Sequence, residues 1–217
     1  MEALMRKILI LLALIACSAF AESRVHDGFY LNFKSGLGYM NTRSLHSTEY
    51  SRIEVENFRG SNAAFRLGGF FNPYVALFGE FSANVATGRS KVYTKDDSFA
   101  ADVFMMDFLF GPGVVVYPFM NFFVAATVGY ATLGISADDY DLRRDDEIDL
   151  SDNGEGFGLQ IELGKEWWVS PNVSLGIDLS YTLVVQDDLE DDSELALEQP
   201  DVPLHVFAQL AVRFFAG

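Results

Sequence analysis

Residues 173–186 alternate strictly between two kinds of side chain. The odd positions are large and apolar: Val173, Leu175, Ile177, Leu179, Tyr181, Leu183 and Val185. The even positions are mostly small or polar: Ser174, Gly176, Asp178, Ser180, Thr182 and Val184. A period of two over this length predicts a β-strand with two unlike faces. Long charged side chains would be expected on a face that meets water, so this polar face favours a narrow, filled interior. We therefore expect the apolar face to meet lipid.

The same alternation recurs along the rest of the chain and gives eight predicted strands. They cover residues 28–39, 63–71, 75–85, 102–117, 122–134, 156–169, 173–186 and 203–215. Most have about the length that crosses a bilayer when a strand is tilted. Long polar segments at 40–61, 86–99, 135–155 and 187–202 alternate with short turns that contain proline and asparagine. This layout predicts an all-β, eight-stranded antiparallel up-and-down transmembrane β-barrel with short periplasmic turns and long extracellular loops.

Aromatic residues crowd the predicted periplasmic end of the strands. They are Phe29, Tyr30, Phe70, Phe71, Tyr74, Tyr117, Phe119, Phe122, Phe123, Trp167, Trp168, Phe214 and Phe215. Amphipathic rings prefer the headgroup level of a membrane, so these residues predict a girdle around the barrel. An alternative is a spanning helix within residues 108–137, which carry no charge. Glycines and prolines interrupt that run, however, and its β-branched and aromatic residues favour a hairpin.

The first 21 residues predict a secretory signal peptide, which leaves residues 22–217 as the barrel domain. Arg6 and Lys7 precede an uncharged run, and Ala19-Phe20-Ala21 is a small-x-small cleavage signal. The single cysteine, Cys17, ends a segment that resembles a lipoprotein cleavage box, so lipidation of Cys17 is the alternative. An exported chain without disulfides must gain its stability from a large hydrogen-bonded framework.

Negative charge is concentrated in two of the predicted loops. The formal net charge is −16, and residues 137–155 hold nine acids against two arginines while residues 187–201 hold eight acids and no base. This balance excludes nucleic acid as a partner, because phosphate recognition needs the opposite sign. Residues 149–154 echo the start of a calcium loop, but the twelfth position is Gln160 and not glutamate. We expect solvated loops and no cofactor, with divalent cations at 135–155 and 187–202 as the alternative.

Together, the signal peptide, the alternating strands, the Pro/Asn turns and the aromatic last strand resemble the small eight-stranded outer-membrane β-barrel family. Outer-membrane protein X, the transmembrane domain of outer-membrane protein A, and outer-membrane protein W typify it. The resemblance covers about residues 28–215 and is architectural. It implies a place in the outer membrane, contact with its lipid and lipopolysaccharide, and insertion by the barrel-assembly machinery. Members usually end on an aromatic residue, whereas here Ala216 and Gly217 follow Phe215.

Seven charged residues fall on the predicted inward face. They are Lys34, Arg66, Glu80, Asp107, Glu162, Asp178 and Arg213. The interior of an eight-stranded barrel is just wide enough to be filled by side chains. Buried charges are costly unless they are paired, so these residues predict a salt-bridged interior with Arg66 opposite Glu80. A path for protons or ions through the same residues is the alternative.

The sequence leaves four functions open. The first is a non-enzymatic barrel with a structural or surface-interaction role, and the second is a small channel for ions or hydrophobic molecules. The third is a lipid A-modifying enzyme, for which His26, His46 and His205 are candidate bases. His205 could reach Thr182, but no His-x-Ser pairing accompanies it. The fourth is a soluble, lipocalin-like carrier with the two faces inverted. We expect the first function, with no catalytic residue.

Overall fold

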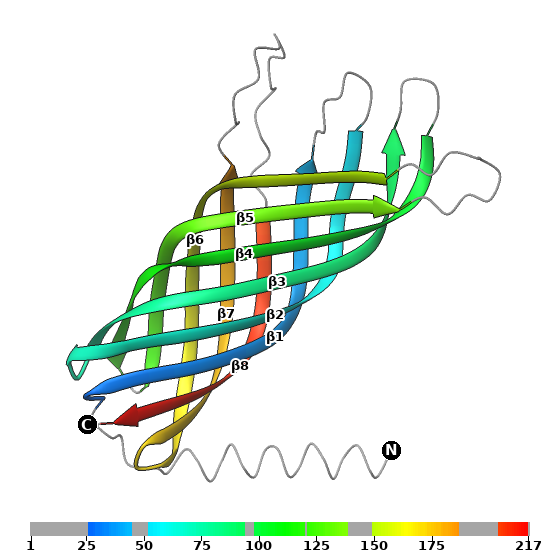
Figure 1. Cartoon of the computed structure of the whole chain (residues 1–217). Coiled ribbons are helices and arrows are strands. Elements are labelled where there is room, and N and C mark those ends of the chain that lie inside the picture. The colour runs from blue at the N-terminus through cyan, green and yellow to red at the C-terminus, as the bar shows by residue number, and fades with distance from the viewer. Residues whose placement is uncertain are drawn as a thin grey trace, which may run out of the picture.

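Eight antiparallel strands close into one barrel in the residues that the structure describes (Figure 1). The structure is a computed structural model and describes residues 26–44, 52–93, 98–119, 121–138, 149–186 and 204–216. The strands are β1 (Phe29–Ser44), β2 (Arg52–Asn72), β3 (Val75–Tyr93), β4 (Ser98–Phe119), β5 (Phe122–Asp138), β6 (Asp149–Ser170), β7 (Val173–Gln186) and β8 (Leu204–Ala216). Each strand pairs with its neighbour in chain order, and β8 pairs with β1 to close the ring. The predicted up-and-down barrel is therefore confirmed.

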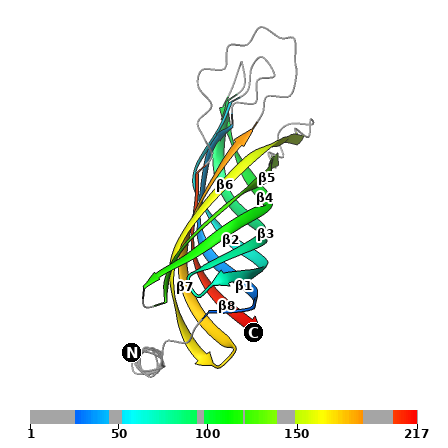
Figure 2. The ribbon, with the colours of Figure 1, turned by 90° about the vertical axis from the view of Figure 1, so that its left-hand side faces the viewer.

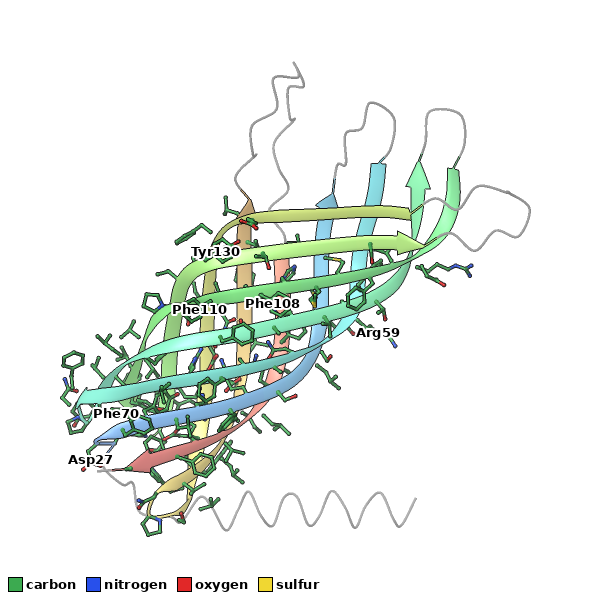
Figure 3. The ribbon with its side chains drawn as sticks, viewed as in Figure 1. Asp27, Arg59, Phe70, Phe108, Phe110 and Tyr130 are labelled. Atoms are coloured by element: carbon green, nitrogen blue, oxygen red, sulfur yellow. The ribbon has the colours of Figure 1, made fainter. Side chains whose placement is uncertain are left out.

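The alternation of side chains has the orientation that the sequence predicts. Leu175, Ile177 and Leu179 on β7 are 45%, 48% and 52% exposed, whereas Asp178 between them is buried. Phe110 on β4 and Tyr130 on β5 are paired neighbours on the outward face (Figure 3). Large exposed apolar side chains recur on every strand, which is typical of a barrel surrounded by lipid. This orientation contradicts the soluble carrier, whose apolar side chains would face inward.

Backbone hydrogen bonds join neighbouring hairpins at the periplasmic end, where β8 also ends (Figure 1). The amide of Tyr117 donates to the carbonyl of Tyr74 at 2.8 Å, and the amide of Glu166 donates to the carbonyl of Asn121 at 3.0 Å. Asn121 has a φ of 61°, a left-handed conformation that asparagine tolerates in tight turns. These bonds satisfy turn groups that would otherwise remain unpaired near the membrane.

The strands extend further toward the external end than the sequence predicts. Of the predicted loop at 40–61, residues 40–44 and 52–61 are strand, and of the predicted loop at 86–99, residues 86–93 and 98–99 are strand; 45–51 and 94–97 lie outside the described residues. In the predicted loop at 135–155, β5 continues to Asp138 and β6 begins at Asp149. Beyond the lipid both faces of a strand can meet water, so the apolar alternation ends while the backbone pairing continues. The short connections lie where the sequence predicts them.

The uncharged run at 108–137 forms the β4–β5 hairpin and not a helix. No helix among the described residues is long and apolar enough to cross a membrane. The two strands approach closely at Gly111 and Gly129, because a Cβ atom at Gly111 would lie 2.0 Å from the carbonyl oxygen of Val128. Glycine at such positions lets strands bend and cross at the inclination seen in Figure 2. The glycines that argue against a helix thus allow the close approach of β4 and β5 in the barrel wall.

Candidate functional site

The seven predicted inward charges lie inside the barrel and are buried. They come from seven different strands, since β5 is the one strand that contributes none of them. Each occupies the inward position that the two-residue period of its strand dictates. The structure distributes these residues over three polar layers, which we call the centre, the outer polar layer and the inner polar layer.

The centre consists of two cations and two carboxylates from four strands. Lys34 Nζ lies 2.9 Å from Glu80 Oε1 and 2.5 Å from Glu162 Oε2. Arg66 Nη2 lies 3.0 Å from Glu80 Oε2 and 2.8 Å from Glu162 Oε2. Arg66 faces Glu80 directly across the β2–β3 pair, as the sequence predicts. Every cation contacts both acids, so the charge of the centre is fully compensated.

Neutral side chains add hydrogen bonds to the centre, in which Arg66 Nε has no partner among the described residues. Thr127 Oγ1 donates to Glu80, and Gln160 Nε2 donates to the same carboxylate at 3.2 Å. Thr182 Oγ1 in turn donates to Gln160 Oε1 at 3.1 Å. The Arg66 guanidinium lies 4.4 Å from the centre of the Phe78 ring, within the range of a cation–π contact. Such additional hydrogen bonds offset part of the desolvation cost of the buried ion pairs.

The outer polar layer is built from amides around one acid, Asp107. Asn84 Nδ2 donates to Asp107 Oδ1 at 2.6 Å, and Asn84 Oδ1 accepts from Asn62 Nδ2 at 2.5 Å. Gln209 Nε2 extends this chain by donating to Asn62 Oδ1. His205 Nδ1 lies 2.5 Å from Asp107 Oδ2, but the two groups are not aligned as a hydrogen bond. We therefore treat the His205–Asp107 contact as electrostatic.

The inner polar layer contains Arg213 between two acids. Arg213 Nη2 donates to Asp178 Oδ2 at 3.0 Å, and its Nε lies 3.6 Å from Glu166 Oε2. Glu166 also accepts hydrogen bonds from Tyr117 Oη at 3.1 Å and from Ser174 Oγ at 3.2 Å. The sequence interpretation missed Glu166, although it continues the inward alternation of Glu162 along β6. Extending that alternation by four residues would have found it.

His26 closes the inner polar layer from the segment that precedes β1. Its Nε2 lies 2.5 Å from Glu166 Oε1, and its ring stacks on Tyr117 at 3.9 Å between centroids. Gly28 has a φ of 67°, and its carbonyl accepts a hydrogen bond from the amide of Phe70 at 2.9 Å. Glycine adopts such a conformation at no steric cost. The segment therefore folds back into the barrel, where His26 is buried.

Two apolar layers cover the three polar layers from both ends. The outer apolar layer comprises Met40, Phe58, Ala86, Val103, Met105, Leu109, Ala131, Leu133, Val184 and Phe207. The inner aromatic layer comprises Tyr30, Ala76, Phe78, Val115, Tyr117, Phe123, Ala125, Trp168 and Phe215, with Phe70 packed against it. Inward glycines leave space for large side chains, because a Cβ atom at Gly176 would lie 1.9 Å from Arg213 Nη1. Buried side chains of both apolar layers and of the polar layers thus occupy the described lumen, as an eight-stranded barrel allows.

The inner aromatic layer corrects the prediction that the periplasmic aromatics form one girdle. Five adjacent pairs each place one ring outward and one inward, because neighbouring residues of a strand face opposite sides. The outward members are Phe29, Phe71, Phe122, Trp167 and Phe214, and the inward members are Tyr30, Phe70, Phe123, Trp168 and Phe215. The girdle exists, but half of these rings fill the end of the lumen.

Comparisons with known proteins place this geometry in a family. The model described as the outer membrane protein beta-barrel domain matches residues 8–197. The chain belongs to this outer-membrane β-barrel family. Its barrel therefore lies in the outer membrane, with the short turns on the periplasmic side. Strand β8 lies beyond the matched residues, yet it completes the ring by pairing with β1. No curated protein matches the sequence.

Several solved outer-membrane proteins share the fold of this barrel at low sequence identity. Ail, the attachment invasion locus protein of Yersinia pestis, is 15% identical with a TM-score of 0.53, and the match covers 86% of this chain and 99% of that one. OprG from Pseudomonas aeruginosa is 12% identical with a TM-score of 0.53, covering 88% and 99% of the two chains. The outer membrane protease OmpT from Escherichia coli is 10% identical with a TM-score of 0.51, covering 91% and 100%.

His205 does not form a catalytic arrangement with the residues that the structure describes. His205 faces Thr182 across the β7–β8 pair, but both side chains are buried and the Thr182 hydroxyl is bonded to Gln160. A nucleophile needs its base within reach and access to a substrate, and here the outer apolar layer covers the pair. His46 lies outside the described residues, as do Cys17 and the predicted signal peptide.

No group of metal-ligating side chains is found among the residues that the structure describes. The residues that echo a calcium loop, 149–154, lie in strand β6 and pair with β5, so they do not form a loop. Of the two segments considered for divalent cations, 135–138 and 149–155 are strand, and 139–148 and 187–202 lie outside the described residues.

The lumen holds more buried acids than buried bases. The acids are Glu80, Asp107, Glu162, Glu166 and Asp178, and the bases are Lys34, Arg66 and Arg213. The two buried histidines each contact an acid that lies outside the balanced centre: His26 contacts Glu166, and His205 contacts Asp107. Each buried acid of the described lumen thus lies beside a cation or an imidazole.

Proposed function

We propose that this protein is a closed, non-enzymatic barrel whose role is structural or lies in contacts at the cell surface. The observation that supports the proposal is that buried side chains of the inner aromatic layer, the three polar layers and the outer apolar layer project into the lumen. A conducting path would need hydrated space through all of these layers. Hydrolysis or acyl transfer would need an accessible nucleophile, and the candidate pair of Thr182 and His205 is covered.

The external segments supply the chemistry for surface contacts. Residues 137–155 and 187–201 together carry seventeen acids and two arginines. The Ail structure contains the heparin analogue sucrose octasulfate, a polyanion. An acidic surface repels such a ligand, so we infer that the partners of this barrel are basic proteins or divalent cations that bridge to lipopolysaccharide.

The closed lumen is tested by single-channel recording of the refolded, full-length protein in a planar bilayer. We expect no steady unitary conductance. The matched variant Met105→Gly/Leu109→Gly/Phe207→Ala removes three side chains of the outer apolar layer, and we expect it to conduct more often than the parent protein. Reproducible unitary openings of the parent would contradict the proposal and favour the small channel.

A second measurement separates the non-enzymatic role from the lipid A-modifying enzyme. Lipid A extracted from cells with and without the protein is compared by mass spectrometry. We expect identical acyl patterns. A new acylated or deacylated species that disappears in the His205→Ala variant would make the barrel an enzyme.

The contacts with divalent cations and basic partners are tested by calorimetry on the detergent-extracted protein. We expect weak, saturable heat on titration with calcium or with a polylysine peptide, and no heat with heparin. Heat with heparin and none with the cations would overturn the proposed charge preference.

A further inference from the structure

The charged residues of the outward face are distributed unevenly between the two ends of the barrel. Among outward strand residues whose side chains the structure describes, four charged ones lie toward the external end: Arg59, Arg89, Asp102 and Glu155. Figure 3 shows Arg59 on the outside of the wall. Toward the periplasmic end the same set contains one charged residue, Lys165 on β6. Between the two ends these described outward positions are uncharged.

The distance along β6 places Lys165 at an edge of the apolar band. Glu155 and Lys165 are ten residues apart on this strand. At about 3.3 Å per residue the separation is about 33 Å along the strand, or about 23–27 Å along the membrane normal at a tilt of 35–45°. The apolar band of an outer-membrane barrel is about 25 Å tall. When Glu155 lies at the external edge, Lys165 therefore lies at the periplasmic edge.

The side chain of Lys165 is held between two rings of the girdle. Its Nζ lies 4.7 Å from the centre of the Phe122 ring and 5.5 Å from the Trp167 ring. Phe122 is its paired neighbour on β5, and Trp167 is the next outward residue of β6. Cation–π contacts fix the position of an ammonium group but do not satisfy its hydrogen-bond donors. Lys165 forms no salt bridge with any residue in the described part of the chain.

We propose that Lys165, Phe122 and Trp167 form a binding site for the headgroup phosphate of an anionic phospholipid in the periplasmic leaflet. The site offers a positive charge that no described acid neutralises, at the depth where phosphates lie. The two rings restrict the lysine to the membrane interface, where amphipathic rings themselves are favoured. Anionic lipid adds a Coulombic attraction that a zwitterionic lipid lacks, and each basic residue near such a surface contributes a preference of about fivefold.

The fluorescence of Trp167 can report lipid binding at the site, because Trp167 faces lipid. Trp168, the second of the two tryptophans, is buried in the lumen. The experiment uses the full chain with Trp168→Phe, refolded into phosphatidylcholine vesicles and checked by heat-modifiable gel migration. Quenching of Trp167 is then measured with brominated phosphatidylglycerol and with brominated phosphatidylcholine. We expect half-maximal quenching at about fivefold less brominated phosphatidylglycerol.

Three variants assign this preference to the lysine. We expect Lys165→Met, which keeps a side chain of similar length, to make the two brominated lipids equivalent. Lys165→Arg should retain the preference, and Arg59→Met, which removes a charge at the opposite edge, should leave it unchanged. Equal quenching by the two lipids in the parent protein, or a preference that survives in Lys165→Met, would overturn the proposal. If Trp168→Phe does not refold, the same ratios are measured with Trp168 present, since a buried tryptophan adds a constant background.

Discussion

The centre and the outer polar layer both bury charged side chains but compensate their charges differently. In the centre, Lys34 and Arg66 each contact both Glu80 and Glu162, so four ion pairs share four residues. In the outer polar layer, Asp107 has one aligned hydrogen bond from Asn84 and faces His205 out of line. The comparison shows that the barrel concentrates its strongest electrostatic contacts in one layer, and that amide hydrogen bonds link the side chains of the next.

This difference predicts that the centre depends on its charges and the outer polar layer does not. Removing one partner of a buried ion pair leaves an uncompensated charge, which is far more destabilising than the net value of the pair. An amide that replaces a carboxylate, by contrast, can still accept a hydrogen bond. Four substitutions, taken from the largest expected effect to the smallest, test how far the comparison extends.

Arg66→Met has the largest expected effect. It leaves Glu80 and Glu162 with Lys34 as their one cation, so we expect the free energy of unfolding to fall by about 3–5 kcal/mol. The measurement is urea unfolding of the refolded protein in lipid vesicles, followed by tryptophan fluorescence. The double variant Arg66→Met/Glu80→Gln should recover part of the loss. A loss below about 1 kcal/mol in the single variant would show that the centre is not the electrostatic core of the barrel.

Gly176→Ala extends the comparison to the inner polar layer. The added methyl group would lie 1.9 Å from Arg213 Nη1, so the guanidinium must leave its position between Asp178 and Glu166. We expect a loss of about 1–3 kcal/mol in the same unfolding measurement. The matched control is Gly79→Ala, because a Cβ atom at Gly79 meets no atom within 4 Å. Equal stability of the two variants would show that Arg213 can be displaced without cost.

His26→Ala tests how much the segment before β1 contributes. Glu166 would lose its contact with the imidazole but keep those with Tyr117, Ser174 and Arg213, so we expect a loss of about 1–2 kcal/mol. The His26 ring also lies 5.3 Å from that of Trp168, and the variant should therefore change the tryptophan emission of the folded state. Asp27→Ala, at the exposed neighbouring position, should change neither quantity. An unaltered emission spectrum in His26→Ala would place His26 outside the lumen.

Asp107→Asn has the smallest expected effect. The amide oxygen can accept the hydrogen bond from Asn84, and the substitution removes one of the excess negative charges. We expect the free energy of unfolding to stay within about 1 kcal/mol of the parent value. Glu162→Gln in the centre is the matched comparison and should cost several times more. If the two carboxylates proved equally important, the contrast between the layers would be wrong.

The sequence predicts the part of the fold that lipid determines. Strand β7 has the predicted bounds of 173–186, because its whole length alternates between lipid and lumen. Strand β2 was predicted at 63–71 and runs from Arg52 to Asn72, since its external half has lost the apolar alternation. Backbone pairing beyond the membrane leaves no such pattern in the side chains, and its extent could not be predicted from one sequence.

The candidate site likewise has a part that the sequence predicts and a part that it does not. The inward position of the seven charged residues follows from periodicity, and so does the opposition of Arg66 and Glu80, which lie close to a short turn. The distribution of these residues over three layers depends on the stagger between strands, which the alternation does not reveal. The sequence interpretation missed Glu166 because it lies among Lys165, Trp167 and Trp168, and the two tryptophans were assigned to the aromatic girdle.

The adjacent aromatic pairs at the periplasmic end have a consequence for how a strand finds its place in the wall. If a strand shifted by one residue during insertion, Trp168 would face lipid and Trp167 the lumen, and both surfaces would still receive an aromatic ring. The same shift at the centre would carry Arg66 into the hydrocarbon and leave Phe65 or Leu67 beside Glu80. A one-residue shift is therefore less costly at the periplasmic end than at the centre. The ion pairs of the centre are the contacts that distinguish the correct strand register from a shifted one.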